Sequence, residues 1–180
     1  IERRVAAGLD PKVSSVASLF VSRWDVAANK RLPGALHNRL GIAVAAQTYR
    51  AYRELLAAPR WHQLASAGAH VQRPLWASTG TKDPAAPDTL YVEALAAPDT
   101  INTLPEKTLF AFSDHGKVQP SLQGDGGDTT IAQCREAGID IDALAEQLQR
   151  EGAESFSQSW AKLLDNLAGK AKAAPGKAAA

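Results

Sequence analysis

The feature that most constrains the fold is a repeated alternation of strand and helix over the first two thirds of the sequence. Residues 13–21 form a run of β-branched and small side chains without strict alternation, which is typical of a strand buried on both faces. Residues 73–78 predict a second strand of this kind, and residues 99–104 a third, shorter one. Apolar spacing predicts helices at residues 39–57, 60–67 and 90–97 and from residue 105 onward. This order predicts a parallel α/β architecture.

The last third of the sequence is predicted to be helical. A polar, glycine-rich loop at residues 116–127 precedes it, and its run Gly-Asp-Gly-Gly-Asp at residues 124–128 lacks the alternating ligands of a calcium loop, so we interpret it as a flexible connection. Helices are expected at residues 129–137, 139–150 and 154–167. The sequence therefore predicts an ordered part, residues 1–168, and a low-complexity, disordered tail, residues 169–180.

The length does not suit a closed sheet. Three parallel strands leave two unpaired edges, and an eight-stranded α/β barrel needs typically about 250 residues, with roughly 200 as a lower bound. This chain has 180 residues, contains no methionine and begins with Ile1, although removal of an initiator methionine normally requires a small residue after it. We therefore expect the sequence to be a piece of a longer polypeptide.

Charge and composition exclude several classes of protein. Twenty Lys and Arg against nineteen Asp and Glu give a net charge of +1, with no basic stripe for nucleic acid. No run of 18 apolar residues would span a bilayer. Cys134 is the sole cysteine, which excludes an internal disulfide and a multi-cysteine metal site. The expectation is a soluble cytoplasmic protein that binds neither nucleic acid nor membrane.

The common cofactor motifs are also missing. The sequence contains no G-x-G-x-x-G after a strand, no G-x-x-x-x-G-K-[ST] and no G-x-S-x-G. Its four histidines share no spacing typical of metal ligands, and we interpret them as surface or supporting residues; they are His37, His62, His70 and His115.

Polar residues at the carboxyl ends of the predicted strands are the remaining candidates, because α/β barrels place their sites there. Arg23 follows the first strand, and residues 78–82, Ser-Thr-Gly-Thr-Lys, follow the second. An arginine can hold a phosphate through two hydrogen bonds, and hydroxyls can fill its other oxygens. The alternative is that Arg23 pairs with Asp25 and that Lys82 is simply solvated.

Three motifs resemble the transaldolase family. Residues 17–25 (ASLFVSRWD) are similar to its S-x-F-V-[GS]-R-x-D segment. Residues 73–84 (RPLWASTGTKDP) resemble the seventh-strand segment of the actinobacterial and cyanobacterial-type branch, R-P-L-W-A-S-T-x-x-K-N-P. DTLYV at residues 88–92 and PDTINTLPE at residues 98–106 resemble the segments that follow in that branch. Phe156 and the WAKLL stretch at residues 160–164 look like the family's C-terminus.

This resemblance implies the C-terminal part of a class I aldolase-type TIM (β/α)₈ barrel, about strands six to eight with the terminal helices. The implied reaction moves a dihydroxyacetone unit from sedoheptulose 7-phosphate to glyceraldehyde 3-phosphate through a lysine Schiff base, in the pentose phosphate pathway. No metal or organic cofactor is implied, and the partners are phosphorylated sugar substrates and the missing N-terminal half of the barrel.

The resemblance also implies site residues. Ser18 and Arg23 match the family's sixth-strand serine and arginine, which contact the substrate phosphate. Ser78 matches the seventh-strand serine beside a second cation. The better-studied branch has arginine at the position of Gly80, and we infer that Lys82 supplies that charge here.

The nucleophile is the main departure from the family pattern. The family's Schiff-base lysine lies in a buried strand, whose apolar surroundings lower the pKa of the amine. None of the lysines at positions 12, 82, 107, 117 and 162 has such a setting. The chain is expected to carry phosphate-binding residues without the catalytic lysine, and to be inactive by itself.

Two other functions remain open at this point. The first is a non-catalytic half-barrel that binds a sugar phosphate, or a protein partner at an exposed sheet edge. The second is a helical interaction module that docks through the apolar stripe of the last predicted helix, although such a stripe is more often part of a core.

Overall fold

The computed structural model describes residues 1–118, 122 and 125–173. The chain divides into two compact units, residues 1–139 and residues 140–180. The elements of the first unit are α1 (Glu2–Ala6), β1 (Ser15–Phe20), α2 (Val21–Ala28), the 3₁₀ helix η1 (Gly34–Leu36), α3 (Leu40–Ala57), α4 (Pro59–Ser66), β2 (Gln72–Ala77), α5 (Leu90–Ala94), β3 (Ile101–Asn102), α6 (Glu106–His115) and α7 (Asp128–Glu136). The second unit contains α8 (Ile141–Ala173).

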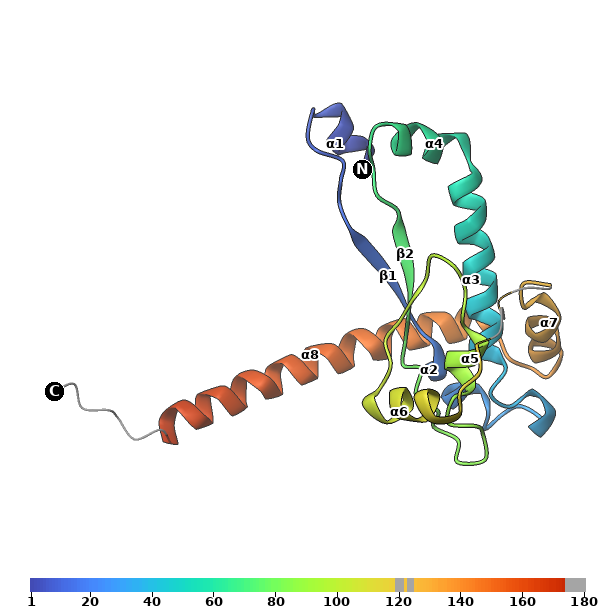
Figure 1. Ribbon diagram of the computed structural model, residues 1–180. Helices are drawn as coiled ribbons and strands as arrows, with labels where there is room; N and C mark the ends of the chain where they lie inside the picture. The colour runs from blue at the N-terminus through green and yellow to red at the C-terminus, as the bar shows by residue number, and fades with distance from the viewer. Residues whose placement is uncertain (119–121, 123–124, 174–180) are drawn as a thin grey trace. The chain divides into compact units, whose positions relative to one another are not determined.

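The strands of the described residues form a parallel sheet in the order β1-β2-β3, which confirms the parallel α/β architecture. Figure 1 shows β1 and β2 side by side. Along β1 and β2 the register pairs Ser15 with Gln72 and Phe20 with Ala77. Trp76 of β2 lies opposite Asn102 of β3, so the carboxyl ends of all three strands meet at one edge. The third strand is only two residues long, shorter than the six predicted.

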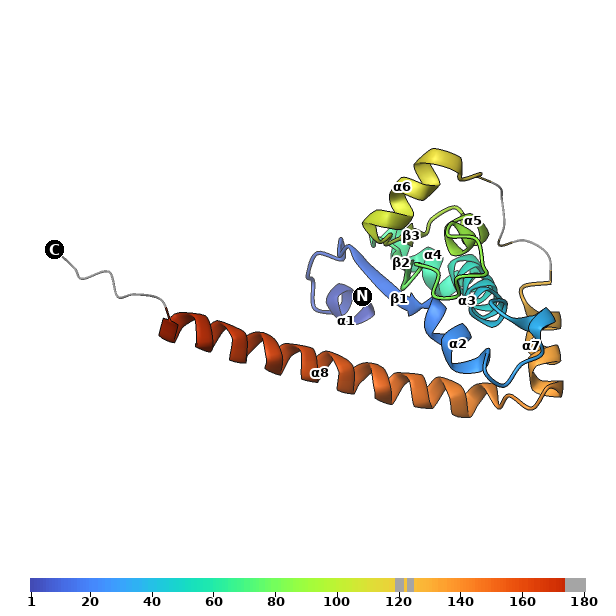
Figure 2. The same ribbon diagram turned by 90° about the horizontal axis from the view of Figure 1, so that it is seen from below.

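The hydrophobic core lies on one face of this sheet, toward α3 and α5. Leu19 and Trp76 are opposite each other in the register and therefore point to the same face. Trp76 is completely buried and belongs to a cluster with Ala45 of α3 and Tyr91 of α5. Figure 2, seen from below, shows α3 and α5 beside the sheet. Residues 16, 18 and 20 of β1 point to the other face.

The prediction that the first strand is buried on both faces is wrong for the described residues. Ser15, Val16, Ala17 and Ser18 are exposed, and only Leu19 and Phe20 are partly buried. The reason is that β1 is an edge strand, which pairs with β2 and with no other strand among the described residues. The β-branched composition of β1 suits a buried strand, but the described residues do not bury it.

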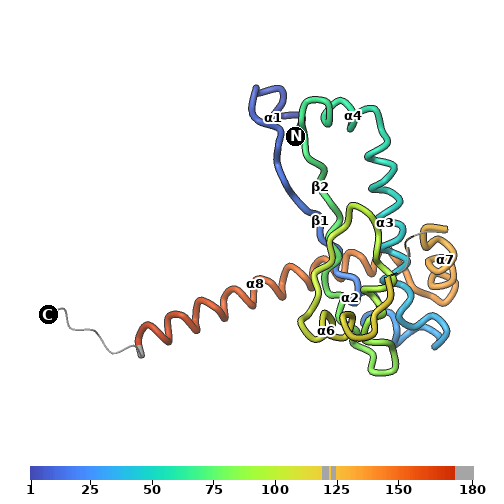
Figure 3. The backbone as a smooth tube through the Cα atoms, in the orientation of Figure 1, coloured from blue at the N-terminus to red at the C-terminus, as the bar shows by residue number. Residues whose placement is uncertain are grey.

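Two helices also differ from the sequence expectation. Helix α2 was not predicted, and it begins at Val21, directly after the last residue of β1. Two helices were expected at residues 139–150 and 154–167, but α8 is continuous through Gly152. An interior glycine costs a helix about 1 kcal/mol, too little to break a long one. The backbone tube in Figure 3 shows both features.

Helix α8 includes residues 169–173 of the expected disordered tail, and residues 174–180 lie outside the described residues. The disordered tail therefore stays a prediction. Within residues 1–118, 122 and 125–173, no helix is long and apolar enough to cross a membrane.

Candidate functional site

The ends of β1 and β2 are joined by two serines that follow them. The backbone N–H of Ser22 donates to the carbonyl oxygen of Ser78 over 3.2 Å. The two side-chain oxygens, Ser22 Oγ and Ser78 Oγ, lie 2.8 Å apart. Ser22 is 1% exposed, whereas Ser78 is partly exposed at the edge of the sheet. Sequence reasoning selected Ser78 and overlooked Ser22, although the two form one pair.

Ser78 has an unusual backbone conformation. Its φ is +56°, in the left-handed region that residues with a side chain rarely adopt. Holding such a residue there costs of order 1–3 kcal/mol, which the surrounding contacts must offset. The two contacts from Ser22 are among those that offset this cost. The turn at Ser78 leads the chain from β2 into the loop that carries Lys82.

Arg23 lies in the first turn of α2, one residue after Ser22. The guanidinium carbon of Arg23 lies 4.5 Å from the ring centroid of Phe20, a cation–π arrangement. Phe20 and Ser18 share one face of β1, because side chains alternate along a strand. The structure therefore brings Ser18 and Arg23 to the face of the sheet opposite the core, at its carboxyl end.

The alternative ion pair between Arg23 and Asp25 does not form. The Asp25 carboxylate is 1% exposed, accepts hydrogen bonds from the Gly41 N–H over 3.0 Å and from the Tyr91 hydroxyl over 2.8 Å, and lies at the amino end of α3. Burial raises the pKa of Asp25, and these hydrogen bonds oppose that rise. The same burial, with the Asp25 charge, raises the pKa of Tyr91. Asp25 thus anchors α2, which carries Arg23, to α3 and α5.

The loop after Ser78 uses its threonines internally. The Thr79 hydroxyl is buried and donates to Asn102 Oδ1 over 2.8 Å, and the Thr81 hydroxyl donates to the Pro87 carbonyl over 2.9 Å. The expectation that several hydroxyls of this loop would face a phosphate is therefore wrong for both threonines, which shape the loop instead. Ser78 and Lys82 remain as its candidates.

Lys82 is exposed, and its ammonium lies beside Gly80. A Cβ atom added to Gly80 would lie 3.8 Å from Lys82 Nζ and 3.0 Å from the Pro105 ring. The ammonium therefore occupies the space next to the position where the better-studied branch has arginine. A larger residue at position 80 would press on Pro105, whereas Lys82 reaches this space from two residues further along the loop.

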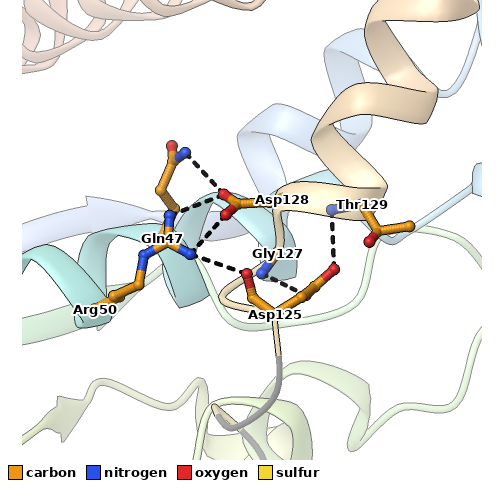
Figure 4. A network of polar contacts seen from close by, with 6 residues as sticks. All are labelled: Gln47, Arg50, Asp125, Gly127, Asp128 and Thr129. Atoms are coloured by element: carbon orange, nitrogen blue, oxygen red, sulfur yellow. Dashed lines mark hydrogen bonds and ion pairs between the residues drawn. The ribbon is translucent and has the colours of Figure 1, made fainter.

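A second polar network lies away from this edge, around Asp128 (Figure 4). Arg50 of α3 donates to both oxygens of the Asp128 carboxylate over 2.7 and 2.9 Å and to the Asp125 carbonyl over 2.9 Å. The Asp125 carboxylate accepts hydrogen bonds from the N–H groups of Gly127 and Thr129. The Arg50 guanidinium lowers the pKa of Asp128.

This network contradicts a flexible connection for residues 125–128. Gly126 and Gly127 both have positive φ, and Cβ atoms there would lie 2.5 Å from Arg50 Nη1 and 2.3 Å from the Ala43 carbonyl oxygen. The segment is therefore packed tightly on α3, while residues 119–121, 123 and 124 lie outside the described residues. No cluster of His, Cys, Asp and Glu that could hold a metal ion occurs in the described part of the chain. The network holds the start of α7 against α3 and has a structural role.

The fold and the site define a parallel α/β protein with serine, arginine and lysine side chains at the carboxyl edge of its sheet. Residues 3–167 match the transaldolase/fructose-6-phosphate aldolase family. The chain belongs to this family, as its motifs predicted.

Curated relatives agree with the family. The chain is 45% identical over 178 residues to the transaldolase of Parafrankia sp., covering 93% of this chain and 48% of the relative. It is 46% identical over 173 residues to that of Acidothermus cellulolyticus, with 91% and 46% covered. For the transaldolase of Mycolicibacterium smegmatis the identity is 43% over 185 residues, with 97% and 50% covered. The chain spans about half the length of these relatives.

Proposed function

We propose that this chain is the C-terminal part of a transaldolase, a transferase that moves a dihydroxyacetone unit from sedoheptulose 7-phosphate to glyceraldehyde 3-phosphate. Family membership, similarity to about half the length of transaldolases and the open three-stranded parallel sheet support the proposal. In this proposal β1, β2 and β3 are strands six to eight of a TIM (β/α)₈ barrel of the class I aldolase type. The protein is cytoplasmic and acts in the pentose phosphate pathway.

The residues of this chain bind the phosphate of the sugar. Ser18 and Arg23 approach it from β1 and α2, and Ser78 and Lys82 from the end of β2 and the following loop. Arginine and lysine neutralise the phosphate charge, and the serine hydroxyls donate hydrogen bonds to its oxygens. The single observation that supports this role is the contact between Ser22 and Ser78, which joins the two strand ends that carry the proposed ligands.

The chemical step requires a lysine from outside this chain. Its amine attacks the ketose carbonyl and expels water to form an imine. The protonated imine accepts the electron pair of the C–C bond that breaks, and an aldehyde leaves. Binding the remote phosphate holds the carbonyl carbon in the position that this attack needs.

The missing half of the barrel is then the partner of the exposed first strand. Among the described residues, Ser15–Ser18 of β1 pair with β2 alone, so a neighbouring parallel strand can bond on their other side. The isolated chain is inactive in this proposal, because it lacks the catalytic lysine and half of the walls of the site.

The proposal is tested on the complete protein that contains this chain. Transfer from fructose 6-phosphate to erythrose 4-phosphate is expected, and borohydride reduction in the presence of fructose 6-phosphate is expected to label a lysine outside residues 1–180. A complete protein without transfer activity, or a label on one of the lysines of this chain, contradicts the proposal.

The Arg23→Ala variant tests the phosphate site within that protein. Loss of a charged hydrogen bond is worth about 1.5–3 kcal/mol, which corresponds to roughly a 10- to 150-fold higher KM for phosphorylated substrates. Lys30→Ala, which removes an exposed cation beyond the end of α2 in the same unit, is the control. An unchanged KM in Arg23→Ala would refute the role of this arginine.

A further inference from the structure

Ser22 is a buried polar residue that neither the sequence motifs nor the proposed phosphate contacts assign to a role. It lies between the end of β1 and Arg23, and it is 1% exposed. Two hydrogen-bonding contacts link Ser22 to Ser78, which is 56 positions away in the sequence: one from its backbone N–H and one through its side-chain hydroxyl. A buried hydroxyl without a partner is unfavourable, so the contact with Ser78 Oγ at 2.8 Å satisfies Ser22 as well as Ser78.

The direction of the hydroxyl–hydroxyl bond matters for what Ser78 can do. Each serine hydroxyl has one proton to donate and two lone pairs to accept. If Ser78 donates to Ser22, its proton is no longer available to a ligand. If Ser22 donates to Ser78, the Ser78 proton can point to an anionic oxygen, and the two bonds in series strengthen each other.

The backbone contact acts on the same residue. The N–H of Ser22 donates to the Ser78 carbonyl, and Ser78 is held at a φ of +56°. This conformation turns the chain at Ser78 and sets the direction of the following loop, which contains Lys82. Ser22 therefore affects both the proton of Ser78 and the position of its main chain.

We propose that Ser22 is a positioning residue for phosphate recognition: its hydroxyl donates to Ser78 Oγ, so that Ser78 donates its own proton to the phosphate of the substrate. The inference rests on the proposed transaldolase function and extends it by a residue that touches no substrate atom. Ser22 acts through Ser78, and its effect depends on the presence of the Ser78 hydroxyl.

The test compares two acceptors in the complete protein, erythrose 4-phosphate and unphosphorylated erythrose. A neutral hydrogen bond is worth about 0.5–1.5 kcal/mol, so Ser22→Ala is expected to lower kcat/KM for erythrose 4-phosphate roughly 2- to 13-fold. For erythrose no change is expected, since no phosphate is bound.

A double-mutant cycle separates positioning from general structural damage. Because Ser22 acts through Ser78, the Ser22→Ala/Ser78→Ala double variant is expected to equal Ser78→Ala alone. Thr89→Val is the matched control, because Thr89 is equally buried, at 3% exposed, and donates to Glu93 over 2.9 Å away from the strand ends. It is expected to leave the ratio of the two acceptors unchanged.

The inference is overturned if Ser22→Ala lowers kcat/KM for both acceptors equally, or if the effects of the two serine variants add. Should Ser22→Ala fail to fold, Ser22→Gly in the same cycle gives the same decision. A complete protein without transfer activity would instead reject the proposed function, and an active protein with an unchanged acceptor ratio in Ser22→Ala rejects only the role of Ser22.

Discussion

The carboxyl and amino ends of the sheet differ sharply in how the described residues cover them. At the carboxyl end Trp76 and Thr79 are completely buried, and Ser22, Ser78 and Asp25 are joined by hydrogen bonds to neighbouring segments. At the amino end the first four residues of β1 are exposed, with Val16 at 41%. The first unit thus completes the packing of the end where the candidate site lies and leaves the other end open.

The cause lies in the path of the chain. Helix α2 follows immediately after β1 (Figures 1 and 3), and α5 lies at the same end of the sheet (Figure 1). Strand β3 pairs with Leu75 and Trp76, at the carboxyl end of β2. At the amino end, an ion pair between Glu2 and Arg60, which lies at the surface, joins α1 to α4. Exposed ion pairs contribute little to stability, typically up to about 1 kcal/mol. Apolar packing, which contributes more, is concentrated at the carboxyl end.

Trp76→Ala is the variant expected to have the largest effect on stability, because it removes a side chain from the packed carboxyl end of the sheet. Removing a completely buried Trp side chain is expected to lower the free energy of unfolding by about 3–5 kcal/mol, through lost burial and the cavity left behind. Val16→Ala, at the open end, is the control, with an expected loss below about 1 kcal/mol in the 180-residue chain. Urea unfolding followed by circular dichroism measures both.

The variants Trp76→Ala and Val16→Ala also test the difference between the two ends of the sheet in the complete protein. If another strand covers β1 there, Val16→Ala is expected to cost more than it does in the 180-residue chain. Equal costs of Val16→Ala in the two proteins would contradict covering of the amino end, and equal losses for Trp76→Ala and Val16→Ala would contradict the difference between the two ends.

Gly41→Ala is expected to have a smaller but still clear effect. A Cβ atom at Gly41 would lie 2.5 Å from the Val21 carbonyl oxygen and 2.7 Å from Asp25 Oδ2, so α2 and α3 must separate. Overpacking of this kind typically costs about 1–3 kcal/mol. Gly34→Ala is the matched control, because no atom lies within 4 Å of a Cβ there. Similar midpoints in urea for the two variants would show that the contact between α2 and α3 is looser than described.

The smallest expected effect is a pH dependence at the rim of the carboxyl end. The carboxylates of Asp88 and Asp114, 2.9 and 3.1 Å from the His115 ring nitrogens, raise the pKa of this histidine above its ordinary value of 6.5. Protonated His115 therefore stabilises the folded state fully below pH 6.5, and this contribution is lost as the pH rises through the folded pKa.

The measurement is the melting temperature of the wild type and of His115→Gln as a function of pH, from about pH 5.5 to about pH 9, a range that covers the titration of a histidine with a raised pKa. The difference between the two proteins is expected to shrink as the pH rises. His62→Gln, on the exposed surface of α4, is the control. A constant difference across the range would contradict a role of the His115 charge.

Local sequence patterns sufficed for several elements. The apolar spacing of residues 39–57 predicted α3 closely, because helix periodicity is a local signal. The helix predicted at residues 60–67 corresponds to α4, which begins one residue earlier, at Pro59. The start of α6 at Glu106, directly after Pro105, has a similar origin, because a proline at the first turn is also a local signal. Helix α2 was missed because its short run continues the apolar pattern of β1, without a turn signal between them.

The candidate site was predictable only in part. The motifs selected Ser18, Arg23, Ser78 and Lys82, whose roles in phosphate binding remain proposals. They gave no reason to choose between an ion pair of Arg23 with Asp25 and the observed burial of Asp25. That outcome depends on Tyr91, which is 66 positions away, and on the amino end of α3.

The sequence by itself determined the family, the parallel α/β order and the residue types at the strand ends, because strand and helix patterns and motifs are properties of neighbouring positions. Tertiary structure alone decided that Ser22 meets Ser78, that Thr79 and Thr81 bond within their loop, and that the Lys82 ammonium lies beside Gly80. The physical reason is that hydrogen bonds and burial depend on distances between segments far apart in the chain, and these distances are set when β1 and β2 pair.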